Sequence, residues 1–171
     1  VAKMDKNKKR INLNNQFLEQ AVFAIADGYC RINLTKDRVP GVMYQVLDGV
    51  EYDLNEQLGM PENSSFSELV KMWALTIPEE GREEFLETVN REKLLERFYK
   101  GEQHITFYYW TRTATYEPML AENHMALFED EETGDVLAIN YVLDRTEQYH
   151  LEQYKKELEQ KNKELERLLK R

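Results

Sequence analysis

Three histidines, one cysteine and several acidic pairs are the side chains of this sequence that could do chemistry. His104 and His124 would share a face if they lay on neighbouring strands, and two imidazoles there could bind a metal ion. No Cys-x-x-Cys, His-x-x-x-His or glycine-rich phosphate-binding motif occurs. The preferred interpretation places the histidines at strand ends and on the surface, so we expect no metal site.

The acidic pairs have the residue types of general acid–base partners, but their positions favour a solvated surface. Glu79 and Glu80 stand at a helix start, and residues 130–132 are acidic residues of a turn. Cys30 is the only cysteine, so no disulfide can form within the chain, and a reducing compartment, the cytoplasm, is favoured. The sequence therefore predicts no catalytic residues.

Large apolar side chains could instead line a small-molecule pocket between helices and a sheet. Such pockets are mostly apolar with a few polar groups. The alternative, which we favour, is that the same side chains simply fill the core, since large rings more often fill space than leave it. The candidate lining residues are Tyr29, Trp73, Phe85, Phe98, Phe107, Tyr109, Met125 and Tyr141.

The elements that would position these residues are predicted from local patterns. Strands are predicted over residues 29–34 and 42–47, and helices fill the middle third, with Ser65 and Asn90 as N-caps. Period-two alternation then predicts three strands, over residues 104–111, 119–128 and 136–143. The fold class is α+β: a five-stranded antiparallel sheet with its helices grouped on one side.

Helices are also predicted to flank this body. Residues 14–26 form an amphipathic helix that is expected to pack on the domain or on a partner, with one apolar side made of Phe17, Leu18, Ala21, Val22 and Ile25. We divide the chain into a basic linker with this helix (1–26), a globular domain (27–146) and a C-terminal coiled-coil helix (147–171).

The C-terminal helix follows directly on the last predicted strand. Asp144 and Glu147 have capping-box spacing, which predicts a stiff joint. Beyond it, apolar residues recur every seven positions, and the preferred register places Leu151, Leu158 and Leu165 at d, with Asn162 and Leu169 at a. The alternative register places the same leucines at a, with Tyr154, Lys161 and Leu168 at d. In either register we expect a homodimer through this helix, to which the N-terminal helix could contribute.

Charge and hydropathy exclude several partners. The net charge is −9 overall, and residues 11–144 alone carry −15, which disfavours nucleic acid. No apolar run approaches the 18 or more residues of a membrane span, and no signal peptide is visible. Because the chain begins with Val1 and stops in mid-helix, we expect a fragment of a longer protein.

Several motifs, in order, resemble a PAS domain of the subgroup found in bacterial signalling proteins. They are residues 77–85, residues 90–95, the 132–135 turn and residues 141–147, where Asp144 and Thr146 match the Asp-x-Thr signature. In the family this signature joins the last strand to a signalling helix, so Asp144, Thr146 and Glu147 become the expected relay residues. Ile77-Pro78-Glu79-Glu80 departs from the subgroup's His-Pro-Asp-Asp.

The resemblance implies a non-enzymatic sensory module in a bacterial signal-transduction protein. Its parent would be an enzyme, with a diguanylate cyclase of the GGDEF class or a two-component histidine kinase as the output domain. Haem and flavin are not expected, since the helical part of the middle third holds no histidine and Cys30 lacks the sequence context of a flavin-adduct cysteine, although an unknown small ligand fits. The alternative is a ligand-free dimerisation scaffold, and a small enzyme is the remote third hypothesis.

Overall fold

The computed structural model describes residues 16–170, which are built around one antiparallel sheet. The strands are β1 (Gly28–Asn33), β2 (Tyr44–Leu47), β3 (Val50–Asp53), β4 (His104–Arg112), β5 (Pro118–Glu129) and β6 (Val136–Asp144). Their order across the sheet is β3-β2-β1-β6-β5-β4, so the first and last strands pair at its centre. The predicted α+β class is confirmed.

The sheet has six strands rather than the predicted five. The additional strand, β3, pairs with β2 across a hairpin whose turn residues, Asp48 and Gly49, have φ values of 50° and 78°. These positive φ values match a tight hairpin turn of the kind that Asp-Gly favours. The sequence pattern marked the turn but not β3, because four residues with two exposed side chains give almost no alternation.

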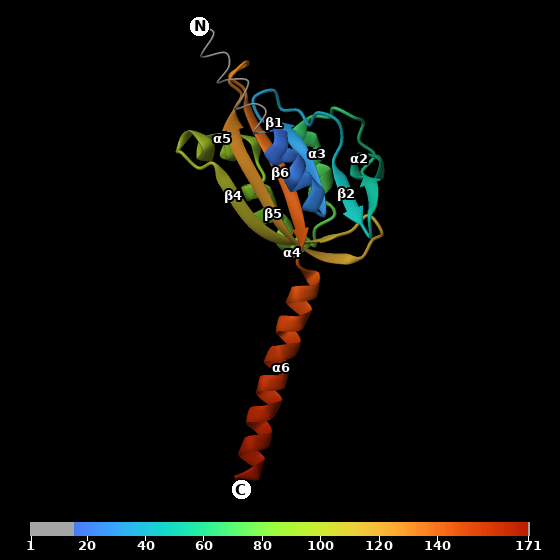
Figure 1. Cartoon of the computed structure of the whole chain (residues 1–171), viewed down its shortest axis with the longest axis vertical. Helices are drawn as coiled ribbons and strands as arrows, with labels where there is room; N and C mark the ends of the chain where they lie inside the picture. Colours follow the sequence, from blue (N-terminus) through green and yellow to red (C-terminus); the bar gives the residue numbers. More distant parts are fainter. Residues whose placement is uncertain (1–15, 171) are drawn as a thin grey trace.

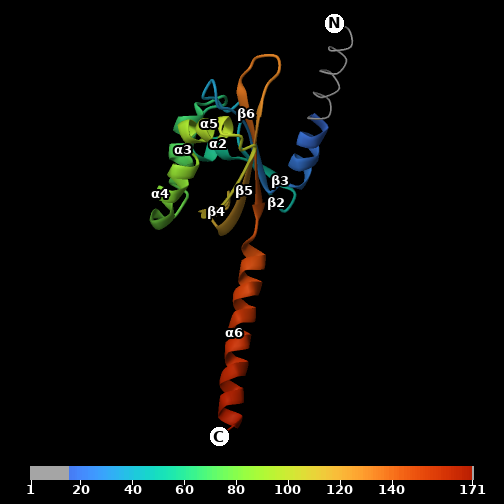
Figure 2. The ribbon, with the colours of Figure 1, turned by 90° about the vertical axis from the view of Figure 1, so that its left-hand side faces the viewer.

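Apart from a helix that precedes β1, the helices lie between β3 and β4 and after β6. They are α2 (Leu54–Gln57), α3 (Phe66–Ala74), α4 (Glu79–Thr88), α5 (Arg91–Tyr99) and α6 (Thr146–Leu169). Both predicted caps are confirmed. The Ser65 hydroxyl accepts from the Glu68 amide, and the Asn90 side chain accepts from the amides two and three residues further along the chain. Figure 2 shows α3, α4 and α5 on one side of the sheet.

Alternation along the three long strands separates two faces. Ile105, Ala121, Met125 and Ala138 are at most 1% exposed and form the core with α3 and α5. The side chains between them point to the opposite side of the sheet, away from these helices, which is termed the outer face.

The N-terminal helix, described from residue 16 to 25, lies on the outer side of the sheet (Figure 2). Phe23 stacks on Tyr29 of β1, with ring centroids 4.3 Å apart. The predicted apolar side points elsewhere: Phe17, Leu18 and Ile25 are 66%, 65% and 74% exposed. Of the two predicted neighbours of this side, the domain is therefore excluded, and packing on a partner stays a prediction. The basic stretch at residues 6–10 lies outside the described residues.

The helix α6 leaves the domain as a straight rod (Figure 1). Every described residue from Tyr149 to Lys170 is exposed. Among residues 16–170, no helix combines the length and apolar character that crossing a membrane requires.

Candidate functional site

A cavity of about 370 Å³ opens between the inner face of the sheet and helices α2 and α3. Its wall is mainly apolar, with contributions from Cys30, Met43, Leu58, Trp73 and Val142. Polar side chains from β2, β4 and β6 interrupt this wall, among them Gln45, Thr111 and Asn140. This composition is that of a small-molecule site, at the lower end of the usual volume range.

The predicted lining residues divide among several places. Trp73 and Tyr109 line the 370 Å³ cavity, and Tyr29 borders it, although the Tyr29 ring stacks on Phe23. Phe85 and Phe107 line a second hollow of about 620 Å³ between α4 and β4. Trp73 and Phe85 meet edge to face, with centroids 5.0 Å apart, so an aromatic cluster stands between the two spaces.

Three of the predicted lining residues do not line these spaces. Tyr141 lies on the outer face, where its ring stacks on His124, so its assignment to a pocket between helices and sheet is wrong. Met125 is fully buried in the core, and Phe98 is a partly buried residue that packs against the core. Strand alternation could have excluded Tyr141, because it places Tyr141 opposite to buried Asn140 and Val142.

Two buried asparagines, which the sequence patterns did not single out, form a polar chain beneath the cavity. The Tyr109 hydroxyl donates to Asn123 Oδ1 over 2.8 Å, and Asn123 Nδ2 donates to Asn140 Oδ1 over 2.6 Å. Asn123 and Asn140 are 0% and 2% exposed. Their positions within apolar strands were the available signal, since a buried amide needs a partner.

Cys30 lies in the cavity wall as a buried free thiol. Burial raises the pKa of Cys30 to about 12. The side chain is therefore a neutral thiol near pH 7 and not a nucleophile, because the thiolate is the reactive form.

The second candidate feature is the joint between β6 and α6. Asp144 does not act as the predicted N-cap: α6 begins at Thr146, and Arg145 occupies the cap position without a capping hydrogen bond from its side chain. Asp144 Oδ1 instead accepts from the Thr146 amide at 3.0 Å and the Thr146 hydroxyl at 2.5 Å. The capping box with Glu147 was the wrong motif, because Asp144 lies one position before the cap and closes a local turn.

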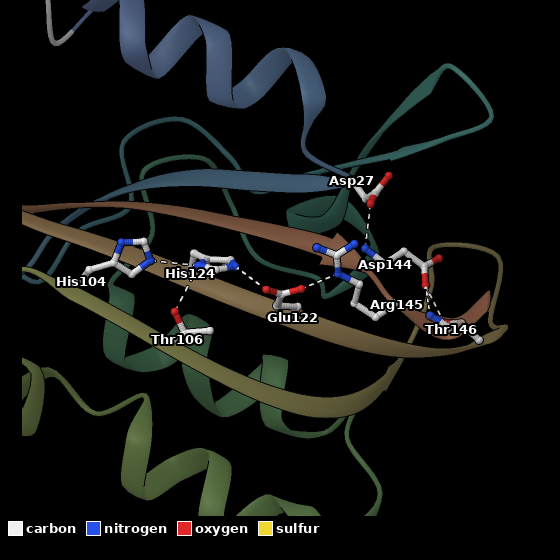
Figure 3. Close-up of polar contacts among 8 residues, drawn as sticks. All are labelled: Asp27, His104, Thr106, Glu122, His124, Asp144, Arg145 and Thr146. Carbon is white, nitrogen blue, oxygen red and sulfur yellow. Dashed lines mark hydrogen bonds and ion pairs between the residues drawn. The ribbon is translucent and has the colours of Figure 1, made fainter. Parts of the chain in front are cut away.

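The joint is also tied to neighbouring segments. The Leu120 amide of β5 donates to Thr146 Oγ1, and the Arg145 amide donates to the Leu120 carbonyl, both over 2.9 Å. On the other side, the Asp144 amide donates to Asp27 Oδ2 over 2.7 Å. The start of α6 is thus fixed to β5 and to the segment that precedes β1 (Figure 3).

A row of polar side chains on the outer face leads to this joint (Figure 3). His104 and His124 lie on adjacent strands, with His104 Nε2 and His124 Nδ1 2.9 Å apart. His124 Nε2 lies 3.0 Å from Glu122 Oε1, and the other Glu122 oxygen pairs with Arg145. The two histidines thus share a face, yet within residues 16–170 no group of three or more His, Cys, Asp or Glu could hold a metal ion.

The Glu122–Arg145 pair predicts a specific acid dependence of stability. The hydrogen bond from Arg145 lowers the pKa of Glu122. A lowered pKa in the folded state contributes stability above the unfolded-state pKa, and this contribution is lost as the pH falls through the folded pKa. We therefore expect Glu122→Gln to lose about 0.5–1 kcal/mol at pH 7 and to show a weaker decline in unfolding free energy between about pH 6 and pH 3 than the parent. Parallel pH profiles from urea titrations would contradict this role.

Neither a protein-family model nor a curated protein matches this chain. Among solved structures, it is similar to the N-terminal domain of a diguanylate cyclase with PAS/PAC sensor from Marinobacter aquaeolei, at 13% identity over 72% of this chain and 98% of that one, with a TM-score of 0.46. A sensory box histidine kinase/response regulator from Burkholderia thailandensis is 15% identical over 86% and 97% of the two chains, with a TM-score of 0.46.

The PAS domain of BvgS from Bordetella pertussis is a third similar structure, at 12% identity over 86% of this chain and 98% of that one, with a TM-score of 0.43. Because the identities and TM-scores are low, the function of this chain is inferred from its own residues.

Proposed function

We propose that this chain is a PAS-like sensory module that passes a signal from the cavity, through β6 and α6, to a fused output domain. The observation that supports the proposal most directly is the short, hydrogen-bonded connection between β6 and α6. The last strand of the sheet continues into α6 after one residue, and that residue, Arg145, is hydrogen-bonded to β5 through its amide. A shift of β6 or β5 would therefore move the helix. Residues 27–146 would form the sensory domain and residues 147–171 the signalling helix, in a cytoplasmic protein.

The exposed apolar stripe of α6 supports pairing with a second copy. Leu151, Leu158 and Leu165 are 62%, 44% and 56% exposed. They repeat at the seven-residue interval of a coiled coil, with Asn162 and Leu169 in the other seam position. We propose a parallel homodimer, in which the two rods reach a diguanylate cyclase or histidine kinase output together.

The cavity favours a sensor over a ligand-free scaffold. A scaffold needs only a filled core, which Phe98 and Met125 do provide. The 370 Å³ space beside Trp73 and Tyr109 would serve no purpose in a scaffold. A ligand that fits the cavity better in one arrangement of β6 and α6 would shift the population toward that arrangement.

Replacing Thr146 by valine tests the joint. The hydroxyl accepts from the Leu120 amide and donates to Asp144, so its loss should cost about 1 kcal/mol of unfolding free energy. Hydrogen exchange of the first turn of α6 should become faster by about fivefold. Thr133→Val is the matched control, because Thr133 makes its side-chain bond to Asp130 in an exposed turn. Unchanged exchange in α6 would contradict a joint held by Thr146.

A further inference from the structure

Two buried amide groups in the wall of the 370 Å³ cavity, those of Gln45 and Asn140, present donors to it, whereas Gln57, a third lining amide, is exposed. Gln45 is 4% exposed, and its Oε1 accepts from the Ala114 amide over 2.5 Å. A backbone N–H can donate only to the oxygen of a carboxamide. The Gln45 oxygen is therefore occupied, and its NH₂ group remains as the donor. The partner of Gln45 Nε2 is the Met119 sulfur, 3.7 Å away, and a thioether is a weak acceptor.

Asn140 has the same arrangement on the neighbouring part of the wall. Its Oδ1 accepts from Asn123 Nδ2, whose own oxygen is taken by the Tyr109 hydroxyl. These two hydrogen bonds therefore fix the orientation of both side-chain amides. The Asn140 NH₂ group takes part in neither of them. Asn140 faces Cys30 across the β1–β6 pairing, and its side-chain hydrogen bond works against the rise in the Cys30 pKa that burial causes. Both Gln45 and Asn140 are thus nine-tenths or more buried, line the cavity, and have their amide oxygens occupied by N–H donors.

The distribution of charged residues along the cavity wall also favours a ligand that accepts hydrogen bonds. Among residues 16–170, no Asp or Glu lines the cavity, and the one charged lining residue is Arg112, at the exposed end of β4. A cationic group inside would find neither a carboxylate there nor a free amide oxygen from Gln45 or Asn140. Burying such a charge without a partner is costly, whereas a buried carbonyl oxygen would satisfy the two amides.

We propose that the cavity binds a small, mainly apolar molecule that carries a carbonyl or carboxylate acceptor, held by the amide groups of Gln45 and Asn140, and that it rejects amines. This inference rests on the proposed sensory function and specifies the chemical class of its ligand. The apolar body would lie against Trp73, Met43 and Leu58, and its acceptor would accept from the NH₂ groups of Gln45 and Asn140.

Three probes of similar size separate the classes: acetophenone, benzoate and benzylamine. Each is titrated into the whole chain labelled with ¹⁵N, and the side-chain NH₂ resonances of glutamine and asparagine are followed. Acetophenone and benzoate should shift the Gln45 and Asn140 signals in a saturable way, and benzylamine should bind at least about tenfold more weakly. Equal binding of benzylamine, or no shift of these two signals with acetophenone, would overturn the proposal.

A pair of variants assigns the effect to the donor. Gln45→Met keeps the length of the side chain but removes its NH₂, and should weaken acetophenone binding about tenfold or more. Gln57→Met is the matched control: Gln57 also lines the cavity and also holds Ala114, but its Nε2 already donates to the Ala114 carbonyl over 2.9 Å. It should lose at most about threefold. An equal loss in both variants would mean that the 113–117 loop, and not the donor, controls binding.

Failure of the proposed ligand class can be distinguished from failure of the proposed sensory function. If acetophenone binds at Gln45 and Asn140 but leaves the backbone resonances of residues 144–150 unchanged, the ligand class is right and signal transfer to α6 is wrong. If no probe reaches the two amides while Thr146→Val still loosens α6, the joint holds and the ligand class is wrong.

Discussion

Leu158→Lys combined with Leu165→Lys should convert the proposed homodimer into monomers whose globular domain stays folded. In the single chain both leucines are exposed and make no contribution to the core. In a pair, four leucines from two chains would leave water, each worth about 1.5–3 kcal/mol. Their replacement by lysines should therefore weaken association by at least about 10⁴-fold. Light scattering should give the mass of one chain where the parent gives two.

The control for this prediction adds the same charge on another side of the helix. Gln153 and Gln160 lie outside the seam in both heptad registers, and both are exposed. Gln153→Lys with Gln160→Lys should remain dimeric. A monomeric control would show that added charge, and not loss of the leucine seam, separates the chains, and a dimeric seam variant would refute pairing through α6.

Asn123→Ala should cause the largest loss of stability among single changes in the polar interior. Asn123 is fully buried, and its loss would leave both the Tyr109 hydroxyl and Asn140 Oδ1 without their partners. Each unsatisfied buried group costs about 1–3 kcal/mol, so we expect a total of about 2–4 kcal/mol. Urea unfolding at a fixed chain concentration measures this loss, since the proposed dimer would make the apparent stability concentration-dependent.

The matched change for Asn123→Ala is Gln153→Ala, which also truncates an amide but on the exposed surface of α6. It should alter the unfolding free energy by no more than about 0.5 kcal/mol. A cost below about 1 kcal/mol for Asn123→Ala would mean that water from the cavity satisfies the two orphaned groups. That result would also count against the inference that hydrogen bonds among Tyr109, Asn123 and Asn140 fix the orientation of the amide groups.

The strong local patterns predicted most of the fold. Alternation located β4, β5 and β6 to within one or two residues, and Ser65 and Asn90 marked two helix starts. The same rules missed β3, which is short and half exposed, and they left two possible neighbours for the N-terminal helix, of which the structure excludes the domain. In that helix, hydrophobic periodicity identified an apolar side, but periodicity cannot tell whether a neighbour covers it.

The candidate site was harder to predict because it depends on pairing between distant strands. Trp73 and Tyr109, two of the candidate lining residues, lie edge to face with centroids 6.0 Å apart, whereas Tyr141 was assigned to the wrong face. Gln45, Asn123 and Asn140 come from three strands, and only the register between β5 and β6 brings the two asparagines together. At the joint, the residues Asp144 and Thr146 were identified, but the partner Leu120 is 26 residues away from Thr146 along the chain.

Disulfide trapping on α6 is the most direct test of the central claim, that two copies join their rods in parallel and in register. Cα atoms of a disulfide lie about 4.4–6.8 Å apart, which suits facing seam residues of a paired helix. Cys30 does not interfere, because it is 2% exposed and its thiol is protonated, with a pKa raised to about 12. On mild oxidation, Leu158→Cys should form a covalent dimer and Gln160→Cys should not. Equal crosslinking at the two positions, or none at residue 158, would contradict the account.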